Sequence, residues 1–173
     1  VYAVSLLATF GISVKGQAKP TSDSALRQVI DGLAYVRQTP VILWTIVASF
    51  ALIFFAMLFP VIPVYARDVL VVDEVKYGWM WGAVALGQGA SALVIAAVGG
   101  VRNKAMGMIV AGLLIGFGII GFGVSEIYWI SLVLLFAIGL GMPLWVTAII
   151  TLLQDHSKPE YRSRVMAVYA ISL

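Results

Sequence analysis

Hydrophobic residues occur along this chain in four long stretches that contain no charged residue. The stretches are Val41–Ala66, Tyr77–Val101, Ala105–Ser125 and Ile127–Gln154. Each meets or exceeds the roughly 20 apolar residues that a helix needs to cross a hydrocarbon core of ~30 Å. In lipid a backbone must satisfy its own hydrogen bonds, so stretches of this length and polarity form helices. The pattern predicts an all-α integral membrane protein with four complete transmembrane helices.

The positive charges between these stretches are sorted by side. Nine of the 11 Lys and Arg residues lie in the first, third and fifth hydrophilic segments, and two lie in the second. Because cytoplasmic loops carry an excess of Lys and Arg, residues 15–39, 102–104 and 154–164 are predicted to be cytoplasmic. Aromatic residues at the opposite, outer ends are expected to anchor the spans among lipid headgroups. These are Tyr65, Tyr77, Trp79, Trp81, Tyr128 and Trp129.

Two shorter apolar runs open and close the chain. Val1–Val14 and Val165–Leu173 are too short to span a membrane alone, and the first has no basic region or cleavage site typical of a signal peptide. We interpret them as the end of one spanning helix and the start of another, which makes the chain a fragment. The expected organisation is a helix end at 1–14, a cytoplasmic linker at 15–39 and a transmembrane bundle at 40–173.

The linker contains apolar residues at close to helical spacing, namely Leu26, Val29, Ile30, Leu33 and Val36. This spacing predicts a short amphipathic helix on the inner membrane surface. Such a helix suits a junction between two bundles, although a lone interfacial helix fits the pattern too. Thr39 and Pro40 are predicted to be the N-cap and first residue of the next helix.

Glycines and prolines mark packing and bending points within the spans. Gly78–Gly82 and Gly112–Gly116 are GxxxG motifs, which let helices approach closely, either in static packing or in helices that slide or bend. Pro60, Pro63 and Pro143 each remove a backbone donor and are expected to bend their helices. Broken helices are tolerated at membrane depth where they face protein or a cavity, so these prolines are expected to face the bundle interior.

Few polar groups lie inside the spans. Gln88 is near the middle of the second span, Ser49 is in the first, and Trp145 and Thr147 are in the last. Each is either part of an interhelical hydrogen bond or a wall residue of a transport cavity. The sequence leaves both interpretations open, and we take these four as the candidate substrate-cavity residues.

Composition excludes several other functions. Charged residues make up 11% of the chain, against about 25% in soluble domains, and there is no Cys. The single histidine, His156, lies outside the spans, and no span contains Asp, Glu, His, Lys or Arg. We therefore expect no metal site, no cofactor and no enzymatic activity. If transport is driven by a proton gradient, the titrating group is expected outside this chain.

Two stretches of the chain resemble a known family, and together the resemblance covers nearly the whole chain. Thr151–Gln154 followed by Ser157–Tyr169 is similar to the loop between helices 10 and 11 of major facilitator superfamily (MFS) exporters, with its pattern TLLQ…P-x-x-x-R-x-R-V-M-x-x-Y. The likeness is to drug- and macrolide-efflux and siderophore-export members. Gly32–Arg37 before Pro40 resembles the linker between their helices 6 and 7. In the first of these two stretches, Ser157 and Glu160 are also predicted to form a capping box at the start of a helix.

The resemblance implies a placement and a mechanism. Val1–Val14 would end helix 6, the four full spans would be helices 7 to 10, and Val165–Leu173 would start helix 11. The chain would be the C-terminal half of a transporter, working with a missing N-terminal half by alternating access, and exporting hydrophobic or amphiphilic small molecules. Loop residues implied to take part in gating are Arg102, Lys104, Arg162 and Arg164.

One departure weakens part of this resemblance. The Gly-x-x-x-Asp-Arg signature that recurs weakly between helices 8 and 9 reads Gly99–Lys104 here and lacks the Asp. A latch built on that loop is therefore doubtful. An uptake carrier and a membrane subunit that scaffolds a complex without transporting remain the alternatives.

Overall fold

The computed structural model describes residues 25–50 and 52–172, and all regular secondary structure in these ranges is α-helical. The helices are α2 (Ala25–Gln38), α3 (Pro40–Ser49), α4 (Leu52–Ala56), α5 (Leu58–Asp68), α6 (Glu74–Val98), α7 (Lys104–Val124), α8 (Tyr128–His156) and α9 (Arg162–Ser172). The all-α prediction is confirmed. The helix end predicted at Val1–Val14 and the first part of the linker, residues 15–24, lie outside the described residues.

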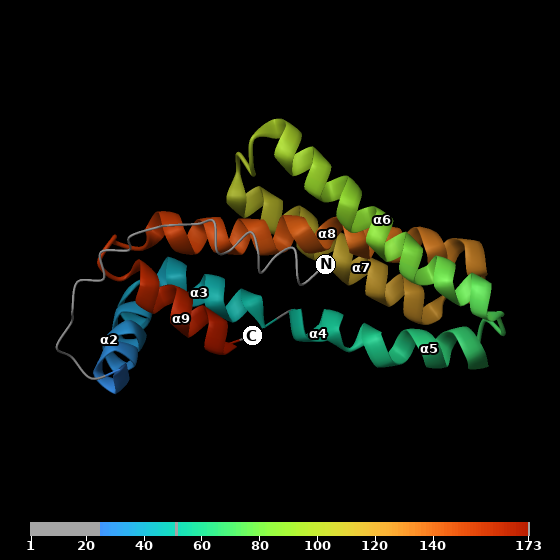
Figure 1. Ribbon diagram of the computed structural model, residues 1–173, viewed down its shortest axis with the longest axis horizontal. Helices are drawn as coiled ribbons and strands as arrows, with labels where there is room; N and C mark the ends of the chain where they lie inside the picture. The colour runs from blue at the N-terminus through green and yellow to red at the C-terminus, as the bar shows by residue number, and fades with distance from the viewer. Residues whose placement is uncertain (1–24, 51, 173) are drawn as a thin grey trace, which may run out of the picture.

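Three helices in the described ranges, α6, α7 and α8, are long and apolar enough to cross a membrane. They correspond to the second, third and fourth predicted spans. α8 is central, because α6 and α7 both pack along it (Figure 1). α6 and α8 run in the same direction, and α7, which lies between them in the sequence, runs in the opposite direction. We call the end with the α5–α6 and α7–α8 connections the outer end and the end with α2 and α9 the inner end, following the charge-based prediction.

The first predicted span, Val41–Ala66, is divided where the sequence predicted one helix. α3 ends at Ser49, α4 covers Leu52–Ala56 and α5 begins at Leu58. The second interruption falls where Pro60 cannot donate a hydrogen bond to the carbonyl of Ala56, four residues earlier. Pro63 and Pro143, by contrast, lie inside α5 and α8 without ending them.

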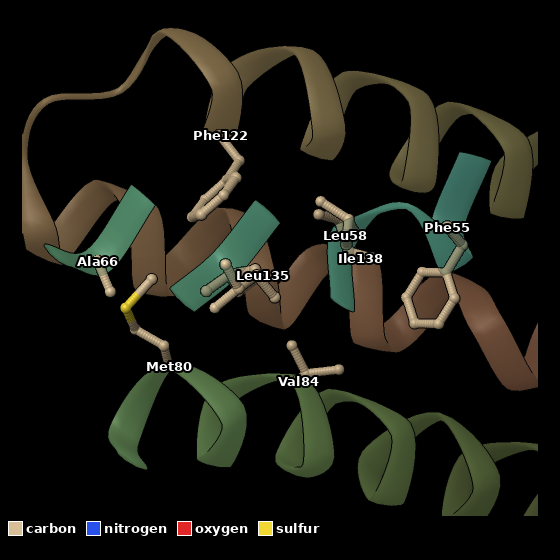
Figure 2. Packing of buried hydrophobic residues seen from close by; sticks show 9 residues of the cluster. Phe55, Leu58, Ala66, Met80, Val84, Phe122, Leu135 and Ile138 are labelled. Carbon is tan, nitrogen blue, oxygen red and sulfur yellow. The ribbon is translucent and has the colours of Figure 1, made fainter. Parts of the chain in front are cut away.

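The divided span nevertheless packs into the bundle at its outer end. Figure 2 shows side chains of α4 and α5 pointing into the space enclosed by α6, α7 and α8. This outer cluster consists of Phe55, Leu58, Ile62, Ala66, Met80, Val84, Phe122, Leu135 and Ile138. In lipid such packing, more than burial of apolar surface, holds helices together.

A second cluster of buried apolar residues lies at the inner end. It joins the linker helix α2 and the short helix α9 to α3 and α8. This inner cluster consists of Val36, Ile42, Ile46, Ile149, Leu153, Val165 and Tyr169. The linker helix therefore packs on protein along one side, whereas the sequence placed it on the membrane surface.

The helix starts agree only partly with the sequence analysis. Thr39 is the N-cap of α3 and Pro40 its first residue, as predicted, although the Thr39 side chain makes no capping hydrogen bond. The predicted capping box at Ser157 is wrong. The Ser157 hydroxyl donates back to the carbonyl of Leu153, and α9 begins only at Arg162. Ser157 is thus used to close α8 rather than to start α9.

The α5–α6 connection contains a strained residue. Val71 has a φ of +46°, a left-handed conformation that a β-branched residue rarely adopts, and its side chain is 80% exposed. Around it, Leu70 N–H donates to the Tyr65 carbonyl and Val72 N–H to the Ala66 carbonyl. These bonds hold the turn in place at the cost of strain at Val71.

Replacing Val71 by glycine is expected to raise the free energy of unfolding by about 1 kcal/mol. Glycine adopts a positive φ without the penalty of about 1–2 kcal/mol that other residues incur there. Thermal unfolding in detergent micelles measures the effect. The control is Val69→Gly, because Val69 has a φ of −107° and offers no strain to relieve. Equal shifts for both variants would contradict this account.

Candidate functional site

The closest helix contact in the bundle is the crossing of α6 and α8. A Cβ built on Gly87 would lie 2.3 Å from the carbonyl oxygen of Phe136, and one built on Gly139 would lie 2.3 Å from that of Val84. Only glycine fits at both positions. Pro143 also removes the helical N–H partner of the Gly139 carbonyl. Where α6 crosses it, α8 therefore lacks both a side chain, at Gly139, and one backbone hydrogen bond, because of Pro143.

The predicted GxxxG motifs have different outcomes. Around Gly78 there is no atom within 4 Å of an added Cβ, and around Gly82 only the ring of Trp79 on the same helix. Gly112 does make a close contact, because a Cβ there would lie 3.0 Å from the ring of Trp145. Gly116 faces open space. The first motif therefore has no helix partner among the described residues, and the second receives an aromatic ring.

That ring forms one wall of a cavity between α4, α7 and α8, with a volume of about 260 Å³. Its other walls are apolar side chains and glycines. The lining residues are Leu52, Phe55, Gly112, Ile115, Gly116, Ile119, Ile120 and Trp145. The cavity lies beside the interruption of the first span, since Leu52 and Phe55 belong to α4. A cavity with such walls suits a hydrophobic molecule.

Trp145 brings one polar group to this region. Its indole nitrogen is buried and has no hydrogen-bond partner in the part of the chain that the structure describes. A buried donor without a partner is unfavourable, typically by about 1–3 kcal/mol. Because this nitrogen is buried, a molecule in the cavity would meet the ring carbons of Trp145 and not its N–H, so the lining of the cavity stays apolar.

The other three candidate cavity residues do not line this cavity. Gln88 is half-buried on α6 beside the Gly139 crossing. Ser49 is buried and its hydroxyl donates to the Ile46 carbonyl. Thr147 is half-buried, and its carbonyl accepts a hydrogen bond from Thr151. The structure therefore does not bring the four predicted residues to one site.

Sequence reasoning missed most of the cavity lining. Ile115, Gly116 and Ile119 belong to α7, which is apolar on every side, so no periodicity marks the face that lines a cavity. The Gly112–Gly116 motif was the available signal, because it removes side chains from one face of that helix.

The inner loops carry the predicted gating residues. Lys104 Nζ lies 2.5 Å from Asp155 Oδ2 and links the start of α7 to the end of α8. The hydrogen bond from Lys104 is the main reason why the pKa of Asp155 is lowered, and the nearby charges of His156 and Arg162 act in the same direction. Burial opposes them. Asp155 is therefore ionised at neutral pH, as its ion pair with Lys104 requires.

The remaining gating candidates differ in their contacts. Arg164 pairs with Asp31 of α2 at 3.6 Å. Arg102 and Arg162 are exposed. The Gly99–Lys104 loop lacks the Asp of the family signature, but the ion pair between Lys104 and Asp155 still connects it to α8.

The outer ends of the spans are joined by tyrosines. The Tyr65 hydroxyl lies 3.0 Å from the Ser125 carbonyl, and the Tyr128 hydroxyl donates to the Lys76 carbonyl at 3.1 Å. Tyr77 accepts a hydrogen bond from the indole of Trp81. Of the six aromatic residues predicted at the outer ends, only Trp79 and Trp129 are largely exposed, as headgroup anchors would be. Tyr65 and Tyr128 therefore also hold helix ends to one another, whereas the bond between Tyr77 and Trp81 lies within α6.

Comparison with known proteins assigns the family. The chain matches the family described as Major Facilitator Superfamily over residues 1–173. Neither the comparison with curated proteins nor that with solved structures found a match. The family match covers the whole chain and agrees with the three described helices that can cross a membrane. The chain therefore belongs to the major facilitator superfamily of multi-pass membrane transporters.

Proposed function

We propose that the chain is the C-terminal half of a secondary transporter that exports hydrophobic or amphiphilic small molecules by alternating access. The observation that carries this proposal is the apolar cavity of about 260 Å³ lined by Trp145 beside the interrupted first span. Its walls offer apolar contact, which fits the hydrophobic part of such a substrate.

The driving force in this proposal is a proton gradient. None of the four predicted spans contains Asp, Glu, His, Lys or Arg, so in this proposal the proton-coupling group belongs to another part of the transporter. The protein would lie in the plasma or inner membrane, with residues 15–39, 102–104 and 154–164 in the cytoplasm. Gln88, Thr147 and Ser49 remain proposed wall residues of the central pathway, and Pro60, Pro63 and Pro143 its bending points.

An exposed face of α6 supports the presence of a second bundle. Small residues recur along it every three or four positions, namely Gly78, Gly82, Ala85, Gly89, Ala92 and Ala96. An added Cβ at Gly78 or Gly89 would meet nothing within 4 Å. In membranes such faces allow a further helix to approach closely. In this proposal the N-terminal half of the transporter docks on this face.

Replacing Trp145 by alanine is expected to lower transport at least tenfold while leaving protein abundance unchanged. The reason is that the substitution removes the aromatic wall of the cavity. The measurement is efflux of a lipophilic cationic dye from proteoliposomes containing the full-length protein under an imposed proton gradient. Trp129→Ala is the control, because that ring is exposed at the outer end.

The same assay separates the alternatives. Dye movement in the opposite direction would indicate an uptake carrier. Absence of movement for every dye and gradient tested, with well-folded protein, would refute the transport proposal and favour a scaffolding subunit.

A further inference from the structure

The linker helix α2 is fastened to the inner end of the bundle by an aromatic stack. The rings of Tyr35 and Tyr161 lie 4.4 Å apart between centroids and are inclined by only 6°. The Tyr35 hydroxyl also accepts a hydrogen bond from the backbone N–H of Lys158 at 3.2 Å. One residue of α2 therefore makes two specific contacts with the connection between α8 and α9.

A second set of contacts surrounds Arg164 at the start of α9. Its guanidinium pairs with Asp31 at 3.6 Å and lies 5.4 Å from the centre of the Tyr161 ring. The backbone of Gly32 lies against the same residue, since an added Cβ would be 3.2 Å from Arg164 Cβ. α2 thus approaches α9 closely at Gly32, the one residue of α2 that has no side chain.

Beneath these polar contacts the interface is apolar and closed. Val36 of α2 is buried in the inner cluster with Val165 and Tyr169 of α9. The opposite face of α2 carries Ile30 and Leu33, which are exposed. This helix therefore has a protein-facing side and a free side, whereas a helix that only rests on lipid needs no protein-facing side.

These contacts point to a permanent joint. An interface made only of exposed ion pairs would be held weakly, because each such pair contributes about 0–1 kcal/mol. Here separation would expose Val36, Val165 and part of the inner cluster, and would break the stack and the ion pair together.

We propose that α2 is a permanent clamp that holds the start of α9 against the bundle and moves with the bundle throughout the transport cycle. The proposal rests on the transport function proposed above, since it concerns what moves during that cycle. It assigns Tyr35, Asp31 and Arg164 a positioning role at the inner end, in place of a latch that opens and closes.

A disulfide across the interface tests this directly, because the chain has no cysteine of its own. The variant is Gly32→Cys with Arg164→Cys in the full-length protein. An added Cβ at Gly32 lies 3.2 Å from Arg164 Cβ, within a few tenths of an ångström of the separation found in disulfides. Gly32→Cys with Val168→Cys is the second pair, because Val168 Cγ2 lies 3.6 Å from the same position. The control pair is Gly32→Cys with Arg162→Cys, since Arg162 is on another side of α9.

We expect both test pairs to cross-link in native membranes at least tenfold faster than the control pair. For the pair Gly32→Cys with Val168→Cys, which keeps Arg164, we expect dye flux after cross-linking to stay within twofold of the flux of the same variant in the reduced state. Cross-linking no faster than in the control pair would overturn the proposal. So would a cross-link that stops flux until a reductant is added, because α2 would then have to leave α9 in each cycle.

Failure of the transport proposal remains distinguishable. If the reduced variants and the unmodified protein show no flux, the transport proposal fails, and the cross-linking yield alone tests the clamp. Equal yields with and without dye and with and without a proton gradient support it. A yield that falls under any of these conditions overturns it.

Discussion

Replacing Gly139 by alanine is expected to destabilise the bundle by about 3 kcal/mol, which is large for the addition of one methyl group. The added Cβ would lie 2.3 Å from the carbonyl oxygen of Val84, and 3.2 Å from the backbone nitrogen of Gln88. Both neighbours are helix backbone, which cannot rotate away as a side chain can. α6 and α8 would have to separate along their whole crossing, and the cost lies near the upper end of that for overpacked cores.

The measurement is reversible unfolding in mixed micelles, with Gly87→Ala as a second test on the facing helix. Gly116→Ala is the matched control, because an added Cβ there meets nothing within 4 Å. It is expected to be neutral or stabilising, since alanine is favoured over glycine in helices by about 1 kcal/mol. If Gly139→Ala and Gly116→Ala have the same effect, the crossing is not the close contact described here.

The glycines also show how far the sequence could predict the packing. The sequence correctly indicates close helix approach, because small residues allow it. It does not indicate which glycines meet a partner. Gly78–Gly82 has the motif and no partner helix among the described residues, whereas Gly87 and Gly139 meet across helices that are distant in sequence. A spacing within one helix carries no information on the helix that faces it.

Hydropathy predicted the second, third and fourth spans closely, because length and apolar character alone decide whether a helix can cross lipid. It failed for the first, where α3, α4 and α5 follow one another. Charge-free sequence looks the same whether or not the helix is interrupted. Pro60 was a usable signal for one interruption, but the end of α3 at Ser49 has none. The cavity beside α4 could not be predicted for the same reason.

Tertiary contacts likewise changed the interpretation of the aromatic residues. Tyr65 lies where a headgroup anchor is expected, yet its hydroxyl contacts the Ser125 carbonyl and its ring packs on Phe122 at 4.8 Å between centroids. Position along a span indicates depth in the membrane, and only the fold determines whether lipid or protein is at that depth. The exposed Trp129 fits the anchoring prediction.

The contact between Tyr65 and Phe122 leads to the second large effect. Replacing Phe122 by alanine is expected to lower the free energy of unfolding by about 3 kcal/mol. Phe122 is 1% exposed and fills the space between α5, α7 and α8 at the outer end (Figure 2). This value is the lower end of the range for buried Phe→Ala changes, because in lipid the lost packing counts more than transfer from water.

Phe117→Ala provides the matched control on the same helix. Phe117 is 69% exposed, so its ring makes little contact with the rest of the described bundle, and its loss is expected to change stability by less than about 0.5 kcal/mol. The two variants lose the same atoms from α7 and differ in what surrounds them. A large effect at Phe122 with none at Phe117 would show that α5, although separated from α3 by two interruptions, is held in the bundle by packing at its outer end. Similar effects at both positions would mean that the outer cluster does not govern the stability of this end, since alanine is the better helix former at both sites.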